Sequence, residues 1–153
     1  MRIGLISDTH GLLRPQAVAF LVGCDRIVHA GDICDAAVLD ALRAIAPTVA
    51  VRGNNDRGTW AEVLQATEAI DVGSVGIVVV HDIADLGAAA EGASVIVSGH
   101  SHRPSVDRRG GVLFVNPESA GPRRFKLPIS AGELSIEDGQ VTVKLVDLGT
   151  LPA

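Results

Sequence analysis

Short runs of β-branched and aliphatic residues recur along the first half of the chain, and each run stops at a cluster of Gly, Asp, Asn or His. The first three runs are Arg2–Ser7, Arg26–His29 and Thr48–Arg52, and they end at DTHG, AGD and GNND. Two helix-like segments, Pro15–Val22 and Ala36–Ile45, lie between them. Strands that alternate with helices in this way predict a parallel sheet joined by right-handed crossovers.

The second half of the chain predicts mainly strands and turns. Glu68–Val72 and Val75–Val80 flank Gly73-Ser74 as a hairpin, Ile83–Glu91 is a short Ala-rich helix, and Ser94–Ser98 is a strand that ends at GHSH. The strands expected after it are Ser105–Asp107, Val112–Val115, Arg124–Leu127, and a final hairpin of Ala131–Ile136 with Gln140–Val146. We therefore expect two sheets packed face to face with helices outside, in one domain over residues 1–153.

The composition fits such a core and narrows the classes of function. The chain is 47% hydrophobic and only 3% aromatic, so Val, Ile, Leu and Ala must fill the interior. A net charge of −5 argues against a protein that binds nucleic acid mainly through its phosphates. Two cysteines, both interpreted as small core residues, cannot make a disulfide framework, and no apolar run reaches the ~18 residues of a membrane span. With no signal-peptide layout, we expect a cytoplasmic protein without a membrane partner.

Polar side chains follow the predicted strands, at the sheet edge where open α/β sheets bind ligands. Seven of them carry oxygen or imidazole nitrogen: Asp8, His10, Asp32, Asn54, His81, His100 and His102. Each short motif alone is also ordinary turn or capping chemistry. Together, however, they supply the ligands of two adjacent cations.

The order Asp-x-His, Gly-Asp, Gly-Asn-x-Asp, His and Gly-His-x-His resembles the calcineurin-like metallophosphoesterases. The fuller strings DTHG, HAGDI, VRGNND, GHSHRP and NPES…PRRF resemble the small YfcE-like prokaryotic phosphodiesterase branch, over roughly residues 2 to 146. The resemblance implies an α/β fold, a four-layer α/β/β/α sandwich of two mixed β-sheets with outer helices, and a dinuclear metal centre.

Carried onto this chain, the resemblance implies one ligand set: Asp8, His10 and His102 for the first metal, Asn54, His81 and His100 for the second, and Asp32 as the bridge. We expect two divalent transition-metal ions, Mn²⁺ first, with Ni²⁺, Co²⁺, Fe²⁺ or Zn²⁺ as alternatives. Such a pair converts a bridging water to hydroxide near neutral pH for in-line attack on phosphorus. The expected activity is hydrolysis of a small soluble phosphoester, with phosphodiesters as the main class.

Three further residues are candidate site residues beside Asp32 and Asn54. Asn55 stands where many larger relatives have a His that protonates the leaving oxygen; an amide cannot, so we expect a preference for good leaving groups. Asn55 then either donates to a phosphoryl oxygen or is a plain turn residue. Asp56 either orients a neighbouring ligand or caps a turn. Arg123 is a candidate phosphate contact, with a solvated charged cluster as the alternative.

Two departures from the family pattern and two competing functions stay open. Asp82 and Glu118 stand where the family usually has Gly. His29, outside the ligand set, is predicted to be a buried, hydrogen-bonded strand histidine, with support of a neighbouring ligand as the alternative. One competing function is a protein-interaction scaffold, because the small subunit of the retromer coat has this fold. The other is a weak nuclease, which the acidic charge and short chain oppose, as they oppose stable nucleic-acid binding. Exposed edge strands leave a homodimer open.

Overall fold

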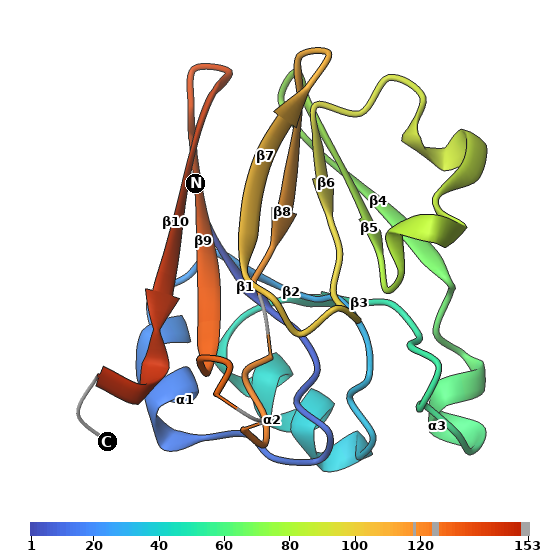
Figure 1. The fold of residues 1–153 in the computed structure, drawn as a ribbon, viewed down its shortest axis with the longest axis vertical. Coiled ribbons are helices and arrows are strands. Elements are labelled where there is room, and N and C mark those ends of the chain that lie inside the picture. The colour runs from blue at the N-terminus through green and yellow to red at the C-terminus, as the bar shows by residue number, and fades with distance from the viewer. Residues whose placement is uncertain (118, 124–125, 151–153) are drawn as a thin grey trace.

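The computed structural model describes residues 1–117, 119–123 and 126–150, and its strands form two five-stranded sheets (Figure 1). The first sheet has the order β10-β9-β1-β2-β3. Its strands are β1 (Arg2–Ile6), β2 (Arg26–His29), β3 (Thr48–Ala50), β9 (Ser130–Glu137) and β10 (Gln140–Asp147). β1, β2 and β3 run parallel, as predicted, and β9 pairs antiparallel with β1.

The second sheet is also mixed, with the order β4-β5-β6-β8-β7. Its strands are β4 (Thr67–Val72), β5 (Val75–Val80), β6 (Val95–Val97), β7 (Ser105–Arg109) and β8 (Val112–Asn116). β5, β6 and β8 are parallel, whereas β4 and β7 are antiparallel edge strands. The prediction of two mixed sheets is confirmed.

The two sheets pack face to face because alternate strand residues are apolar. Val75, Ile77 and Val79 of β5 belong to one buried cluster with Ile3 and Leu5 of β1. A sheet residue's neighbours in sequence point to the opposite face, so this alternation places one side of each sheet in a common core.

Two helices cover the other face of the first sheet. α1 (Pro15–Leu21) has proline in its first turn, and α2 (Ala36–Ile45) is capped by Asp35, whose side chain accepts from the Ala37 N–H. Their buried residues, among them Leu21 and Leu42, form a second core cluster with Ile6 and Ile27 of the sheet. A one-turn helix, α3 (Thr59–Glu62), and a final 3₁₀ turn, η3 (Leu148–Thr150), were not predicted. None of the described helices is long and apolar enough to cross a membrane.

The outer layer on the second sheet is thin. β5 and β6 are parallel neighbours, so the chain between them must cross one face of the sheet, and the inner face is already filled. The crossover contains two 3₁₀ turns, η1 (Ile83–Asp85) and η2 (Gly87–Ala90), seen beside β5 and β6 in Figure 1. The prediction of one helix over Ile83–Glu91 is wrong, because Gly87 has a φ of +53°, outside the right-handed helical region.

Two other predictions concern the loop between β8 and β9. Residues 124 and 125 of the predicted strand Arg124–Leu127 lie outside the described residues, and Lys126 and Leu127 are not in a strand. Pro128 follows them directly; it has no N–H to donate to a ladder and restricts the residue before it. The strand prediction is therefore wrong for Lys126 and Leu127. Glu118 also lies outside the described residues.

Candidate metal centre

The seven side chains predicted as ligands lie on five loops at the carboxyl ends of strands. Asp8 and His10 follow β1, Asp32 follows β2 and Asn54 follows β3, whereas His81 follows β5 and His100 and His102 follow β6. The sandwich brings these loops from both sheets together, and the side chains form two groups that share Asp8. The first contains Asp8, His10 and His102; the second contains Asp8, Asp32 and His81.

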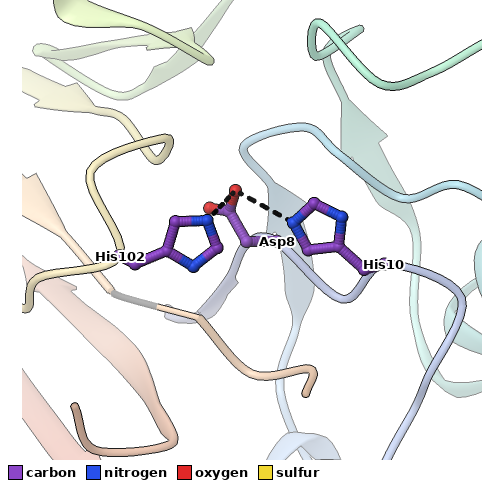
Figure 2. Close-up of side chains that lie close together, drawn as sticks. All are labelled: Asp8, His10 and His102. Carbon is purple, nitrogen blue, oxygen red and sulfur yellow. Dashed lines mark ion pairs between the residues drawn. The ribbon is translucent and has the colours of Figure 1, made fainter. Parts of the chain in front are cut away.

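In the first group the carboxylate of Asp8 lies between the rings of His10 and His102 (Figure 2). Asp8 Oδ1 is 3.8 Å from His10 Nε2 and 3.7 Å from His102 Nε2, and the two rings are stacked 5.6 Å apart. Asp8 Oδ1 and His10 Nε2 are buried, and within the described part of the chain neither atom has a hydrogen-bond partner. Buried polar atoms that face one another without bonding suit a cation between them.

The other oxygen of Asp8 is fully engaged, which orients the carboxylate. Asp8 Oδ2 accepts hydrogen bonds from the Ser7 hydroxyl at 2.6 Å and from the His100 N–H at 3.2 Å. Gly99 makes this approach possible, because a Cβ at that position would overlap the side chains of Ser7 and Asp8. Oδ1 is thereby left facing the two imidazoles.

Asn54 and His100 extend the second group around the ring of His81. His81 Nδ1 donates to the Ala30 carbonyl at 2.8 Å, so the lone pair of the neutral ring is on Nε2. That Nε2 atom faces Asn54 Oδ1 at 2.9 Å, Asp32 Oδ2 at 3.3 Å and His100 Nδ1 at 3.3 Å. Several acceptor atoms directed at one point are the donor set of a divalent transition metal.

Asp32, a member of the second group, also approaches the first group. Its Oδ2 atom is 3.7 Å from His10 Nε2 and 3.3 Å from His81 Nε2. Burial opposes ionisation of Asp32, but the contact with the His81 ring and hydrogen bonds from both amides of Asn55 outweigh it and hold the pKa of the carboxyl well below its usual range. Burial also opposes a charge on His81, yet the contact with Asp32 and the charges of Asp8 and Asp32 raise its pKa. The carboxylate is therefore ionised and stabilises positive charge beside it.

The backbone at these loops is unusual. Five of the seven ligand candidates have a positive φ, between +46° and +70°: Asp8, His10, Asp32, His100 and His102. Residues other than glycine rarely adopt this conformation, and each costs on the order of 1–3 kcal/mol. Such strain persists where the surrounding structure enforces it, and it accumulates at functional sites.

Asp56 provides much of that enforcement. Its buried carboxylate accepts backbone N–H groups from Asp32, Ile33, Cys34 and Gly53, at 2.7 to 3.0 Å. These bonds join the loop that carries Asp32 to the loop that carries Asn54. The contacts of Asp56 are thus with backbone, and it positions ligands by fixing their loops.

Asn55 and Cys34 line the same region. The backbone and side-chain amides of Asn55 donate to Asp32 Oδ1 and Oδ2, both at 2.9 Å. Cys24 is a buried core residue, as predicted, but the half-buried Cys34 is not in the core: its Sγ lies 3.5 Å from His10 Nδ1. Its position two residues after Asp32 was the available signal for this contact.

Two other residues make no hydrogen bond or ion pair with a ligand candidate in the described part of the chain. His29 is fully buried and hydrogen-bonded, as predicted. Arg123 donates to the Leu127 carbonyl at 3.2 Å, and none of its described contacts is with a ligand candidate. The structure thus brings together all seven candidate ligands with Asn55 and Asp56, and places the guanidinium of Arg123 on another loop.

Known proteins resemble this chain in sequence and in fold. A family model for the calcineurin-like phosphoesterase superfamily domain matches residues 1–139. A probable metallophosphoesterase of Methanocaldococcus jannaschii is 34% identical, over 97% of this chain and 82% of its own length. The crystal structure of Entamoeba histolytica Vps29 complexed with Zn²⁺ is similar, with a TM-score of 0.73 and 25% identity over 97% of this chain and 99% of that one. A novel archaeal phosphodiesterase has a TM-score of 0.77 and 20% identity, over 95% of this chain and 100% of its own, and shares the fold.

Proposed function

The chain belongs to the calcineurin-like phosphoesterase superfamily, and we propose that it is a metal-dependent phosphodiesterase that acts on a small soluble phosphoester. The observation that carries the proposal is the position of Asp32, whose Oδ2 atom lies within 3.7 Å of imidazole nitrogens in both groups. One carboxylate between two sets of ligands suits a pair of adjacent cations.

Two divalent cations fit the donor set. The residues that would hold them are Asp8, His10 and His102 for one, Asn54, His81 and His100 for the other, and Asp32 for both. We propose Mn²⁺, with Ni²⁺, Co²⁺, Fe²⁺ or Zn²⁺ as alternatives; the Vps29 neighbour from Entamoeba histolytica is complexed with Zn²⁺. Ions held there would supply Lewis acidity, which would favour ionisation of water for attack on phosphorus and offset charge on phosphoryl oxygens.

The chain's own residues have separate tasks in this proposal. Asp32 would supply fixed negative charge to both ions, and Asn54 would supply a neutral oxygen ligand. Asp56 holds the loops of both residues. Asn55 keeps Asp32 in place, and its exposed amide is also available to donate to a phosphoryl oxygen. The assignment of Arg123 to a substrate phosphate stays a prediction.

The direct test is an assay of chelator-stripped protein with each metal added separately. We expect Mn²⁺ to restore hydrolysis of bis-p-nitrophenyl phosphate more than of p-nitrophenyl phosphate, and Asp32→Asn to abolish both. The rate of hydrolysis should fall steeply across diesters with progressively poorer phenol leaving groups, because Asn55 cannot protonate the leaving oxygen. Such protonation contributes ~10²–10⁴-fold to the rate where a general acid supplies it. Asn55→His should make that loss shallower.

The other outcomes decide between functions. No turnover together with no metal uptake favours a scaffold on the same fold, for which the Vps29 neighbours are the precedent in architecture. Turnover of single-stranded or duplex DNA above that of the small diester favours a nuclease. The cytoplasmic location and the homodimer stay predictions.

A further inference from the structure

We infer that Asp82 is a positioning residue, which holds the ring of His100 in the orientation and tautomer that the second cation site requires. The inference rests on the proposed metal-dependent function. It concerns a residue that sequence patterns alone do not connect to His100.

The two ring nitrogens of His100 face different partners. Nδ1 lies 3.3 Å from His81 Nε2, at the point where the second group of ligands converges. Nε2 points the other way and lies 3.6 Å from Asp82 Oδ2. A neutral imidazole carries its proton on one nitrogen and its lone pair on the other, so a carboxylate at Nε2 favours the proton there. The lone pair is then on Nδ1, the nitrogen that faces the ligand group.

His100 needs such a restraint more than His81 does. The side chain of His100 is 46% exposed, whereas that of His81 is 6% exposed and fixed by the Ala30 carbonyl. Within the described part of the chain, the ring nitrogens of His100 contact only His81 and Asp82. An exposed ring with few contacts has rotational freedom, and Asp82 limits it.

Asp82 itself is anchored. Its Oδ1 atom accepts the Ala84 N–H at 3.0 Å and so caps η1, which fixes the carboxylate at the start of the crossover after β5. The adjacent His81 is a ligand candidate of the same site. One short segment therefore supplies one ligand of the second site and orients another.

The negative charge of Asp82 should also strengthen cation binding at the second site. Asp8 and Asp32 supply the carboxylates of the two ligand groups, whereas Asn54, His81 and His100 add no negative charge. Asp82 adds a negative charge beside His100 and so favours a cation at that site. Its absence should weaken the second cation and leave the first unaffected.

The test is a calorimetric Mn²⁺ titration of metal-stripped protein. Asp82→Asn keeps an oxygen that accepts the Ala84 N–H, so the cap survives while the carboxylate is lost. We expect second-site affinity to fall ~10–100-fold, with the first site unchanged. The matched control is Asp85→Asn, which removes the same charge from an exposed position three residues on in η1 and should leave both sites unchanged.

A second readout separates positioning from a general effect on the loop. In Zn²⁺-loaded protein with ¹⁵N-labelled histidine, we expect an Nε2-protonated His100 whose ring signals shift in Asp82→Asn and not in Asp85→Asn. The inference is overturned if the wild-type chain binds two Mn²⁺ and Asp82→Asn matches Asp85→Asn in affinity and in these signals. A wild-type chain that binds fewer than two ions overturns the proposed function itself.

Discussion

Single residues connect the strands to the ligand loops, and His29 is an example. Its Nδ1 atom accepts the Gly31 N–H at 3.1 Å, and its Nε2 atom is 3.0 Å from the Thr9 hydroxyl, which donates in turn to the Ile33 carbonyl. These bonds join the loop after β1 to the loop after β2. They require a neutral ring, because Nδ1 must accept.

The neutrality of His29 makes the fold acid-sensitive. Burial, aided by His81 and His10 and opposed by Asp32, lowers the pKa of His29 from 6.5 to about 3. Below pH 6.5 His29 is therefore protonated in the unfolded chain but stays neutral in the folded chain. The free energy of unfolding consequently falls as the pH drops toward 3. We expect this residue to contribute a slope of up to ~1.4 kcal/mol per pH unit.

Urea unfolding of chelator-treated protein between pH 7 and 4 measures that slope. His29→Gln removes the titrating group and should have the shallower pH dependence, even though its stability at pH 7 is lower. Equal slopes in the two proteins would show that His29 is not the source of the acid sensitivity.

The ligand candidates were recognisable from sequence, whereas their supporting contacts were not. Motifs such as Asp-x-His and Gly-His-x-His directly follow predicted strands, and the ends of those strands, one from each sheet, meet at the site. The contacts of Asn55 with Asp32, of Cys34 with His10 and of Asp82 with His100 each cross between loops. They depend on left-handed backbone conformations at Asp32, Cys34 and His100 that residue type does not reveal.

At the scale of the elements, the loops after β2 and β3 pack so closely that their contact leaves no room for a side chain at one position. Gly53, in the loop after β3, has no room for a side chain: a Cβ there would overlap the carboxylate and backbone nitrogen of Asp32. Gly76, inside β5, has only ordinary contacts around the same position, the nearest at 3.6 Å. Neither glycine has a positive φ, so the two positions differ in the room available for a side chain and not in this feature of the backbone.

Gly53→Ala should therefore displace Asp32 and disrupt the metal centre. We expect Mn²⁺ affinity to fall at both sites and the free energy of unfolding to fall by ~1–3 kcal/mol. Gly76→Ala, the matched control, should change stability by less than ~1 kcal/mol and leave Mn²⁺ binding intact. Calorimetric titration and urea unfolding of both variants check this; unaltered metal binding in Gly53→Ala would contradict the close approach.

Helices and strands were predicted correctly where the local sequence pattern determines their bounds, and they were missed where it does not. β2, β5 and α2 have the predicted bounds, because apolar periodicity and flanking turn residues define them. The Asp138-Gly139 turn joins β9 to β10 with positive φ at both residues, as a two-residue hairpin requires. The crossover through η1 and η2 has few apolar anchors, so its path depends on the sheet that it covers.

At the scale of the molecule, the sandwich makes the metal centre a junction between the two sheets. Each proposed site draws ligands from both: Asp8 and His10 with His102 in one, and Asn54 with His81 and His100 in the other. Metal binding should then favour the packed arrangement of the sheets over the unfolded chain. The sequence indicated two sheets, but strand order, such as β9 beside β1, depends on long-range pairing that local pattern does not contain.

The central claim is that one carboxylate, that of Asp32, lies between two cations. Anomalous diffraction from crystals grown with Mn²⁺ tests it most directly. We predict two anomalous peaks on either side of Asp32, one touching Asp8, His10 and His102 and the other Asn54, His81 and His100. A single peak, or two peaks of which one does not touch Asp32, would contradict the account.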